Sequence, residues 1–245
     1  MQSKQKTIGR DFFTIDGQAS AIRPFDPDSK TSHTIIKRIL SAKQVKKWMD
    51  DAGRISFSDY QDWATLDPSS LLYSVHDARL SDAARAKIRG FVFLYNERSE
   101  KFRLKRMQEA RFVNLKESAI ALEASFALKP IRGKQSGSGL MSSALRLTCE
   151  RVFQLATKEH FFDETLEKPA FWSKKRKTSL ISQDDILIFG FIDPENISAH
   201  RTLYSAGFRK VGSMKYDATS PQESSLYILN WRALHKKLNL AKNAI

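Results

Sequence analysis

The stretch Pro130-Ile-Arg-Gly-Lys-Gln-Ser-Gly-Ser-Gly139 decides the fold of this chain, because the hydrophobic period of the sequence changes there. Before it, residues 119–128 alternate between two sets of side chains, which predicts a strand. After it, apolar residues recur at helical spacing from Leu140 to about Lys158. A basic, glycine-rich turn between a strand and a helix leaves backbone N–H groups unpaired at the positive end of the helix dipole. The turn therefore predicts a pyrophosphate site, unless it is one of the many short glycine-rich turns that bind nothing.

A second run of elements follows that helix. Residues Ile186 to Ile192 form an unbroken apolar run, as expected for a strand that is buried on both faces. Asp193-Pro194 marks the start of the next helix, and Gly207 predicts its left-handed cap. Further strands are expected at 208–216 and 225–231. Strand, helix and strand in this order form a βαβ unit, which crosses over right-handed and leaves its two strands parallel.

The N-terminal half predicts a mixture of strands and helices. Strands are expected at residues 17–25, 71–75 and 88–95. A helical pattern covers residues 32–64, whereas the charged stretch 98–112 fits either a helix or an extended hairpin. The lysine-rich tail from His235 is expected to fray. These elements together predict an α+β domain with helices layered on a mixed sheet.

Composition limits the kind of protein that this chain can be. Its 245 residues are 41% hydrophobic and include 16 Phe and 4 Trp, which is enough for a substantial core in a single domain over residues 1–245. No apolar run approaches the roughly 20 residues of a membrane span, and no signal peptide is visible. The one cysteine, Cys149, rules out an internal disulfide, and the five His lack metal-ligand spacing. We therefore expect a cytoplasmic, metal-free protein.

The charge of the chain is strongly basic. The sequence has 41 Lys and Arg against 27 Asp and Glu, a net charge of +14. Such a surface attracts polyanions, which include nucleic acid and phosphate-rich cofactors, although a basic proteome would also explain it. Residues 159–185 form an unusually long connection that contains the basic run Lys174–Lys177. That run is either a nucleic-acid contact or part of a solvated loop.

Two segments of the chain resemble the GCN5-related N-acetyltransferase (GNAT) superfamily. The segment Arg132–Gly139 is similar to the acyl-CoA loop of that family, in either of two registers that begin at Arg132 or at Lys134. The segment Asp193–Phe208 is similar to the late motif in which Asn, a small residue, Arg, Leu and Gly-Phe keep fixed spacing. The resemblance covers residues 86–216 and is topological before that point.

The resemblance implies a fold, a cofactor and a set of cofactor-binding positions. The implied fold is a mixed, mostly antiparallel sheet with one splayed parallel strand pair and flanking helices. The implied cofactor is acetyl-CoA or another acyl-CoA. The positions assigned to it are Ala127, Leu128, Arg132, Gly133, Lys134, Gln135, Ser136, Gly137, Ser138, Gly139, Leu140 and Asn196.

The resemblance also implies two catalytic residues. Glu123 is the only ionisable side chain between Ala119 and Leu128, and it is expected to act as the base that deprotonates an ammonium group. Alternatively, it is a rim carboxylate paired with a Lys or Arg. Tyr204 is expected to act as the acid for the departing thiolate, or else to be a packing residue. Asn196 fits both a cofactor contact and a helix cap, while His200 and Cys149 are expected to be structural residues without partners.

Three functions are compatible with these observations. The first is an N-acyltransferase that moves an acetyl group from acetyl-CoA to a small-molecule or peptide amine. The second is an RNA-, tRNA- or ribosome-associated acetyltransferase, and the third is a non-catalytic acyl-CoA-binding module. The acceptor wall is expected from residues 35–63, residues 98–112 and the late strands. Within it the aromatic and acidic residues between Trp48 and Trp63 either receive a cationic amine or belong to a helix pair. A homodimer is also compatible with the sequence.

Overall fold

A computed structural model describes residues 12–26, 29–48, 71–96, 101–114, 120–129, 139–158, 185–216, 220 and 222–242. Its seven strands form one sheet in the order β1-β2-β3-β4-β5-β7-β6. Every neighbouring pair is antiparallel except β4 and β5, which are parallel. The strands are β1 (Ser20–Pro24), β2 (Leu71–Asp77), β3 (Gly90–Asn96), β4 (Ile120–Leu128), β5 (Ile186–Ile192), β6 (Phe208–Lys215) and β7 (Glu223–Leu229). The predicted α+β architecture with one parallel pair is confirmed.

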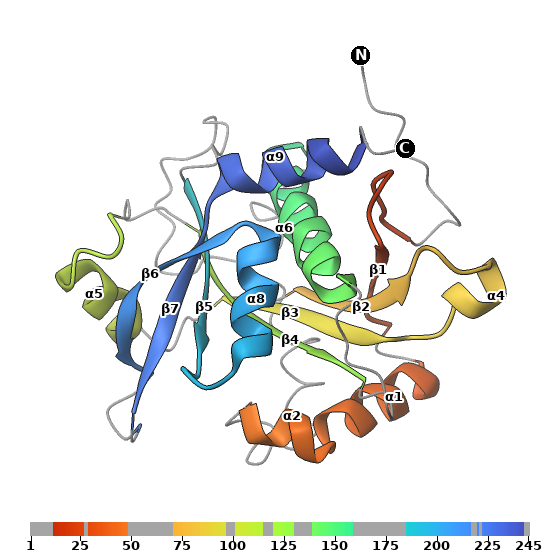
Figure 1. Cartoon of the computed structure of the whole chain (residues 1–245), viewed down its shortest axis with the longest axis horizontal. Helices are drawn as coiled ribbons and strands as arrows, with labels where there is room; N and C mark the ends of the chain where they lie inside the picture. The colour runs from red at the N-terminus through yellow and green to blue at the C-terminus, as the bar shows by residue number, and fades with distance from the viewer. Residues whose placement is uncertain are drawn as a thin grey trace, which may run out of the picture.

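Helices cover both faces of this sheet (Figure 1). The helices are α1 (Lys30–Leu40), α2 (Lys43–Trp48), α4 (Asp82–Arg85), α5 (Lys101–Glu109), α6 (Leu140–Lys158), α8 (Ile197–Ala206) and α9 (Trp231–Lys242). On one face, here called the α6 face, the side chains of α6, α8 and α9 pack against alternate residues of β4 such as Leu122. On the other, the α1 face, α1 and α2 pack near Ala127, and α5 packs near Ala121.

The two-residue period of β4 explains how one strand serves both faces. Ile120, Leu122 and Ala124 belong to the core cluster of the α6 face. Ala121 and Ala127 belong to the clusters of the α1 face. Glu123 alternates with them on that second face, so the carboxylate of this strand points away from α6 and α8.

Most of these elements lie where the sequence predicted them, but the start of α8 and the C-terminus differ. The helix expected to begin at Asp193-Pro194 begins at Ile197 instead, with Asn196 as its N-cap. Residues from His235 were expected to fray, but they continue helix α9 as far as Lys242. The helix holds because Asn230 Oδ1 accepts from the N–H of Ala233 at its start, and because Leu234 and Leu238 are buried. The expected strand at 225–231 ends at Leu229 instead, because α9 begins at Trp231.

Other ambiguous stretches are resolved in the described residues. The charged stretch 98–112 contains helix α5, whose Met107 is buried against the sheet. The helical pattern at 32–64 forms α1 and α2 as far as Trp48, and residues 49–64 lie outside the described part. Most of the basic connection at 159–185 also lies outside it, and one domain over 1–245 therefore stays a prediction. Among the described residues, no helix is long and apolar enough to cross a membrane, and no group of His, Cys, Asp or Glu could hold a metal.

Candidate functional site

The parallel strands β4 and β5 separate halfway along their length. Their register runs from Ile120↔Ile186 to Glu123↔Phe189 and ends there. Beyond that point β4 continues to pair with β3, and β5 continues to pair with β7. Among the described residues, the edge of β4 that faces β5 therefore has no strand partner over residues 124–128, which leaves its backbone N–H and C=O groups for a ligand.

A glycine occupies the point of separation. A Cβ atom added to Gly190 would stand 3.5 Å from the carbonyl oxygen of Ala124 and 3.8 Å from Cδ1 of Leu203. The glycine thus keeps the space between the two strands clear of side chain at the level where they part. A β-branched residue at this position would extend into that space.

Helix α6 begins downstream of β4, after the glycine-rich turn. Gly139 precedes the helix with a φ of +69°, which favours glycine, and its carbonyl accepts from the backbone N–H of Ser143 and from Ser142 Oγ. The 19 residues of α6 direct the positive end of the helix dipole toward this turn. Of the predicted cofactor loop, residues 132–138 lie outside the described part, and Gly139 and Leu140 are described.

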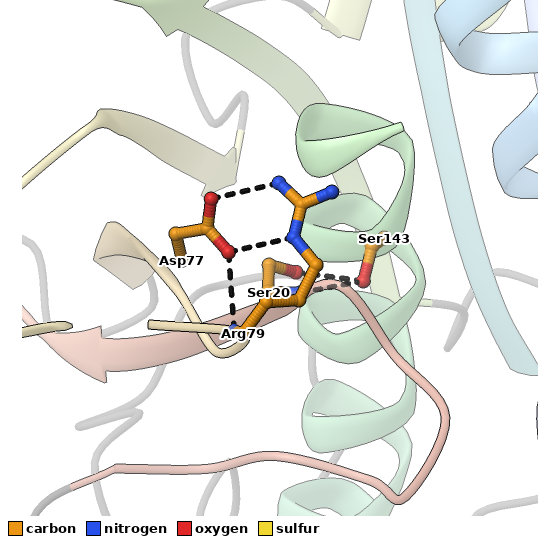
Figure 2. Close-up of polar contacts among 4 residues, drawn as sticks. All are labelled: Ser20, Asp77, Arg79 and Ser143. Carbon is orange, nitrogen blue, oxygen red and sulfur yellow. Dashed lines mark hydrogen bonds and ion pairs between the residues drawn. The ribbon is translucent and has the colours of Figure 1, made fainter. Parts of the chain in front are cut away.

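Polar contacts attach the first turns of α6 to the N-terminal segment (Figure 2). Ser143 Oγ accepts from the N–H of Ser20 at 3.1 Å and from Ser20 Oγ at 2.8 Å, and it donates to Gln18 Oε1 at 3.2 Å. Arg146 donates from Nε to the same Gln18 oxygen at 2.9 Å and from Nη1 to the carbonyl of Ser205 at 2.8 Å. Arg146 thereby links α6 to the C-terminal end of α8, where the helix dipole favours a positive charge.

The link buries the charged end of Arg146, and this burial affects its pKa. Burial lowers the pKa of the Arg146 guanidinium from its ordinary value, because the charged form loses water contact. Sequence analysis missed this residue. Its partners lie 128 and 59 positions away along the chain, so no local pattern could indicate them.

Figure 2 also shows an ion pair in the turn that follows β2. Arg79 donates from Nε and Nη2 to the two carboxylate oxygens of Asp77, at 2.8 and 2.7 Å. The hydrogen bonds from Arg79 hold the pKa of Asp77 below its ordinary value. The pair stabilises the turn and lies beside Ser20, which is opposite Asp77 on β1 and bonds to Ser143 of α6 (Figure 2).

Glu123 stands at the last paired position of β4 and β5. Its Cα is opposite Tyr95 on β3 and Phe189 on β5, and the residue is only 5% exposed. It lies on the α1 face, between the core cluster under α1 and α2 and the cluster under α5. A buried carboxylate at the point where the strands part fits the predicted base, and its catalytic role stays a prediction.

A chain of aromatic contacts lies on the same face as Glu123, and we call its members the aromatic arc: Phe93, Tyr95, Phe189, Phe191 and Tyr216. Tyr95 stacks on Phe93 with 5.3 Å between ring centroids, and its hydroxyl lies 3.4 Å from that of Tyr216. Tyr216 in turn meets Phe191 edge to face at 5.4 Å, and Phe191 meets Phe189 in the same way at 6.0 Å. Sequence analysis did not find the arc, because alternating aromatics on two strands do not reveal that Tyr216 joins them.

The structure does not bring Tyr204 to the separated strands. Tyr204 is 70% exposed on the outer side of α8, and the Nζ atom of Lys237 lies 5.5 Å from its ring centroid. The neighbouring Leu203 is fully buried and approaches Gly190. One residue of offset turns a side chain about 100° around a helix, which explains the difference. The acid role of Tyr204 stays a prediction that this position argues against.

The other predicted residues of α8 have defined partners. Asn196 Oδ1 accepts from the N–H of Ala199 at 3.1 Å, so the predicted helix cap is confirmed, while the cofactor contact stays a prediction. His200 was expected to be structural because the sequence shows no partner for it; its Nδ1 lies 2.9 Å from the hydroxyl of Tyr227 and its Nε2 lies 3.3 Å from the carbonyl of Pro194. Because a carbonyl only accepts, the neutral ring carries its hydrogen on Nε2, and Tyr227 donates to Nδ1.

Burial raises the pKa of two groups, Tyr227 and Cys149. Tyr227 is opposite Gly190 in the sheet, and burial raises the pKa of its phenol. Cys149 on α6 is fully buried, and burial raises the pKa of its thiol well above the ordinary range. A thiol in that state is not a nucleophile, which agrees with the structural role expected for Cys149.

Comparison with known proteins identifies the fold through solved structures, and not through the sequence. No protein-family model matches the sequence, and no curated protein matches it. Among solved structures, the aminoglycoside acetyltransferase AAC(6′)-Ib in complex with coenzyme A and kanamycin is 14% identical, with a TM-score of 0.52 over 89% of this chain and 98% of that one. RimJ of Mycobacterium smegmatis in complex with CoA-disulfide is 14% identical, with a TM-score of 0.52 over 98% and 97% of the two chains. A GNAT-family acetyltransferase of Bacillus anthracis is 14% identical, with a TM-score of 0.50 over 89% and 97%.

This chain has the GNAT fold. The fold that the resemblance implied is therefore confirmed, with its mixed sheet and its one parallel strand pair. In this GNAT-fold protein the separated strands, Gly190 and the start of α6 lie on one side of the candidate site. Glu123 and the aromatic arc lie on the other.

Proposed function

We propose that this protein is an acyl-CoA-dependent N-acyltransferase that transfers an acetyl group from acetyl-CoA directly to a primary amine. The observation that supports the proposal most is the separation of β4 and β5 beyond Glu123, with a glycine at the point where they part. The separation leaves an extended backbone edge on which an extended ligand arm can form hydrogen bonds. The similar proteins crystallised with coenzyme A support the same choice of donor.

The donor lies between the separated strands in this proposal. Backbone groups near Ala127 and Leu128 hold the pantetheine arm. The amides of residues 132–138, with those of Gly139 and Leu140, hold the pyrophosphate at the positive end of the α6 dipole. Asn196 uses Oδ1 for the helix cap, so it meets the cofactor through Nδ2.

The chemistry uses groups that are close to the same point. Glu123 takes a proton from the bound ammonium group, directly or through water, and the neutral amine attacks the thioester carbonyl. Backbone N–H groups of β4 stabilise the negative charge that develops on the carbonyl oxygen. The C–S bond then breaks, coenzyme A leaves as a thiolate, and this thiolate takes up the second proton that the nitrogen loses as the amide forms. Since thiols are much stronger acids than alcohols, the thiolate can leave without an acid on α8, where Leu203 faces Gly190.

Calorimetric titration of the protein with acetyl-CoA tests the proposal directly. We expect saturable binding with a stoichiometry of about one, followed by release of free thiol when a primary amine is added. Binding without any turnover over a broad panel of amines would leave a non-catalytic acyl-CoA-binding module. The absence of binding at millimolar acetyl-CoA would remove both functions.

The net charge of +14 supports a nucleic-acid-associated acceptor as a second candidate. Its test is the salt dependence of binding to tRNA. A steep linear fall of log affinity with log salt concentration would support it, because each neutralised phosphate releases a counterion. An affinity that salt does not change would contradict it.

A further inference from the structure

The aromatic arc crosses the line along which the sheet separates. Tyr95 belongs to β3, in the half of the sheet that ends at β4, whereas Phe191 and Tyr216 belong to the half that begins at β5. The two halves nevertheless meet through the hydroxyl groups of Tyr95 and Tyr216, which are 3.4 Å apart and partly buried. The arc is therefore a continuous chain of aromatic contacts, here called the wall, on the face that carries Glu123, whose Cα is opposite Tyr95 and Phe189.

Only part of the arc is available to a ligand. Phe93 and Phe189 are at most 1% exposed, and they pack against Tyr95 and Phe191 respectively. Tyr95, Phe191 and Tyr216 are half-buried, so each ring keeps some surface that a ligand can cover. An aromatic face attracts a cation and also packs against apolar groups. The carboxylate and the three half-buried rings together suit an ammonium group that is attached to an apolar body.

The position of Tyr216 is held by packing at the end of β6. The ring of Phe112, from the segment after α5, packs directly on Gly212 of this strand, and a Cβ atom there would force that ring to move. Arg106 of α5 also donates to the carbonyl of Lys215, next to Tyr216, at 3.5 Å. The wall is thus built on packed elements and not on an isolated loop.

Charge around the arc disfavours an acceptor with several positive groups. Helices α1 and α2, on the same face, carry Lys and Arg and no Asp or Glu within their described bounds. On α5 the single acidic residue, Glu109, forms an ion pair with Lys105 of the same helix at 3.7 Å. On β4, Glu123 is the carboxylate next to the wall. A polycation that placed one ammonium group at Glu123 would meet the positive charges of α1, α2 and α5 with its other groups. The acidic residues predicted to help, between Trp48 and Trp63, lie outside the described residues.

We propose that Tyr95, Phe191 and Tyr216 form the acceptor-binding wall, and that the acceptor is a single primary amine on an apolar or aromatic body instead of a polycation. The inference rests on the proposed function and specifies its acceptor. Tyr216 and Phe191 are positioned to determine specificity, whereas Glu123 reacts with the amine.

Calorimetry with three amines tests this inference on protein saturated with coenzyme A. The probes are phenethylamine, spermidine and kanamycin. We expect phenethylamine to bind at least about tenfold more tightly than either polycation, since only its single charge and its ring match the wall. Acetyl transfer from acetyl-CoA should follow the same order in kcat/KM.

Variants of the wall make the test specific. Tyr216→Ala should weaken phenethylamine binding about tenfold and leave the acetyl-CoA affinity within twofold, while Tyr216→Phe keeps the ring and most of the binding. Phe191→Ala repeats the test from β5 if Tyr216→Ala fails to give a thermal unfolding transition like that of the wild type. Arg232→Ala is the control, because that residue is exposed on α9 and should change neither affinity.

The outcomes separate the inference from the proposed function. Acetyl-CoA binding together with tighter binding of spermidine or kanamycin overturns the inference and leaves the function intact. Unchanged phenethylamine binding in both Tyr216→Ala and Phe191→Ala does the same. No acetyl-CoA binding overturns both.

Discussion

The two faces of the separated strand pair are built in different ways. On the α6 face the candidate donor site consists of backbone: the unpaired edge of β4, the glycine at 190 and the start of α6. On the α1 face the candidate acceptor site consists of side chains, Glu123 and the aromatic arc, contributed by separate strands. A backbone site can be recognised from a contiguous motif, whereas a side-chain site depends on which strands the fold brings together. Variants that damage one face and spare the other test this division.

The largest effect is expected from Glu123→Gln on the α1 face. Loss of the base should lower kcat by roughly a hundredfold or more, because a positioned base contributes that much to proton removal. The affinity for acetyl-CoA should stay within twofold, since the donor site lies on the other face. Initial rates and calorimetry measure the two quantities on the same preparation.

Tyr204→Phe is the control for this comparison. Its exposed ring on α8 predicts less than a twofold change in kcat. An unchanged rate for Glu123→Gln would remove Glu123 from the base role, and a large loss for Tyr204→Phe would restore the tyrosine as the acid.

The second effect concerns the α6 face. Gly190→Val should fill the space between β4 and β5 and weaken acetyl-CoA binding by about tenfold or more, as expected for overpacking at a site with little room. Gly190→Ala is the matched control. Its Cβ would stand 3.5 Å from the Ala124 carbonyl oxygen, an ordinary contact, so its affinity should resemble that of the wild type.

Phenethylamine binding reports on the α1 face in the same two variants. It should survive in Gly190→Val if the variant keeps the wild-type thermal unfolding transition. Equal acetyl-CoA affinity for the valine and alanine variants would show that the donor does not pass between these strands.

A third effect tests how α6 is held in place. Arg146→Met removes charge-assisted hydrogen bonds to Gln18 and to the carbonyl of Ser205, and it should lower the free energy of unfolding by about 1–3 kcal/mol. Urea denaturation followed by circular dichroism measures the change. Arg201→Met, at an exposed position of α8, should change it by less than about 0.5 kcal/mol. Equal stabilities of the two variants would mean that Arg146 contributes no more than a surface residue.

The smallest effect is expected at the exposed ion pair in the turn after β2. Arg79 depresses the pKa of Asp77 below its ordinary value of 3.8, so the pair stabilises the folded state at neutral pH. The contribution is present above the pKa of the unfolded chain and is lost as the pH falls through the lower pKa of the folded state. Asp77→Asn should therefore cost about 0.5 kcal/mol at pH 7, because Arg79 is half exposed. The two proteins should become equally stable in acid, and a difference that persists there would exclude the ion pair as its cause.

Sequence analysis was most successful where local periodicity coincides with burial. Strand β5 and helix α6 were predicted at their observed bounds. An unbroken apolar run of seven residues fits a strand that is buried on both faces, and a long apolar stripe at helical spacing fits a helix that covers a core. Gly207 was predicted as a left-handed cap and has a φ of 106°. Helix α9 was missed because its polar and basic residues suggested a solvated tail. Only the buried contacts of Leu234 and Leu238 reveal that it packs.

The sequence by itself determined the order of elements and the presence of a glycine-rich turn between a strand and a helix. Those features depend on interactions between neighbours in the chain: the alternation of β4, the stripe of α6 and the caps of α8. Only the tertiary structure decided which residues share a site. Tyr95 and Tyr216 are 121 positions apart, and Arg146 and Gln18 are 128 apart. Leu203, not Tyr204, meets Gly190. Contacts of this kind depend on strand pairing and on helix rotation, and the period of a segment does not encode either.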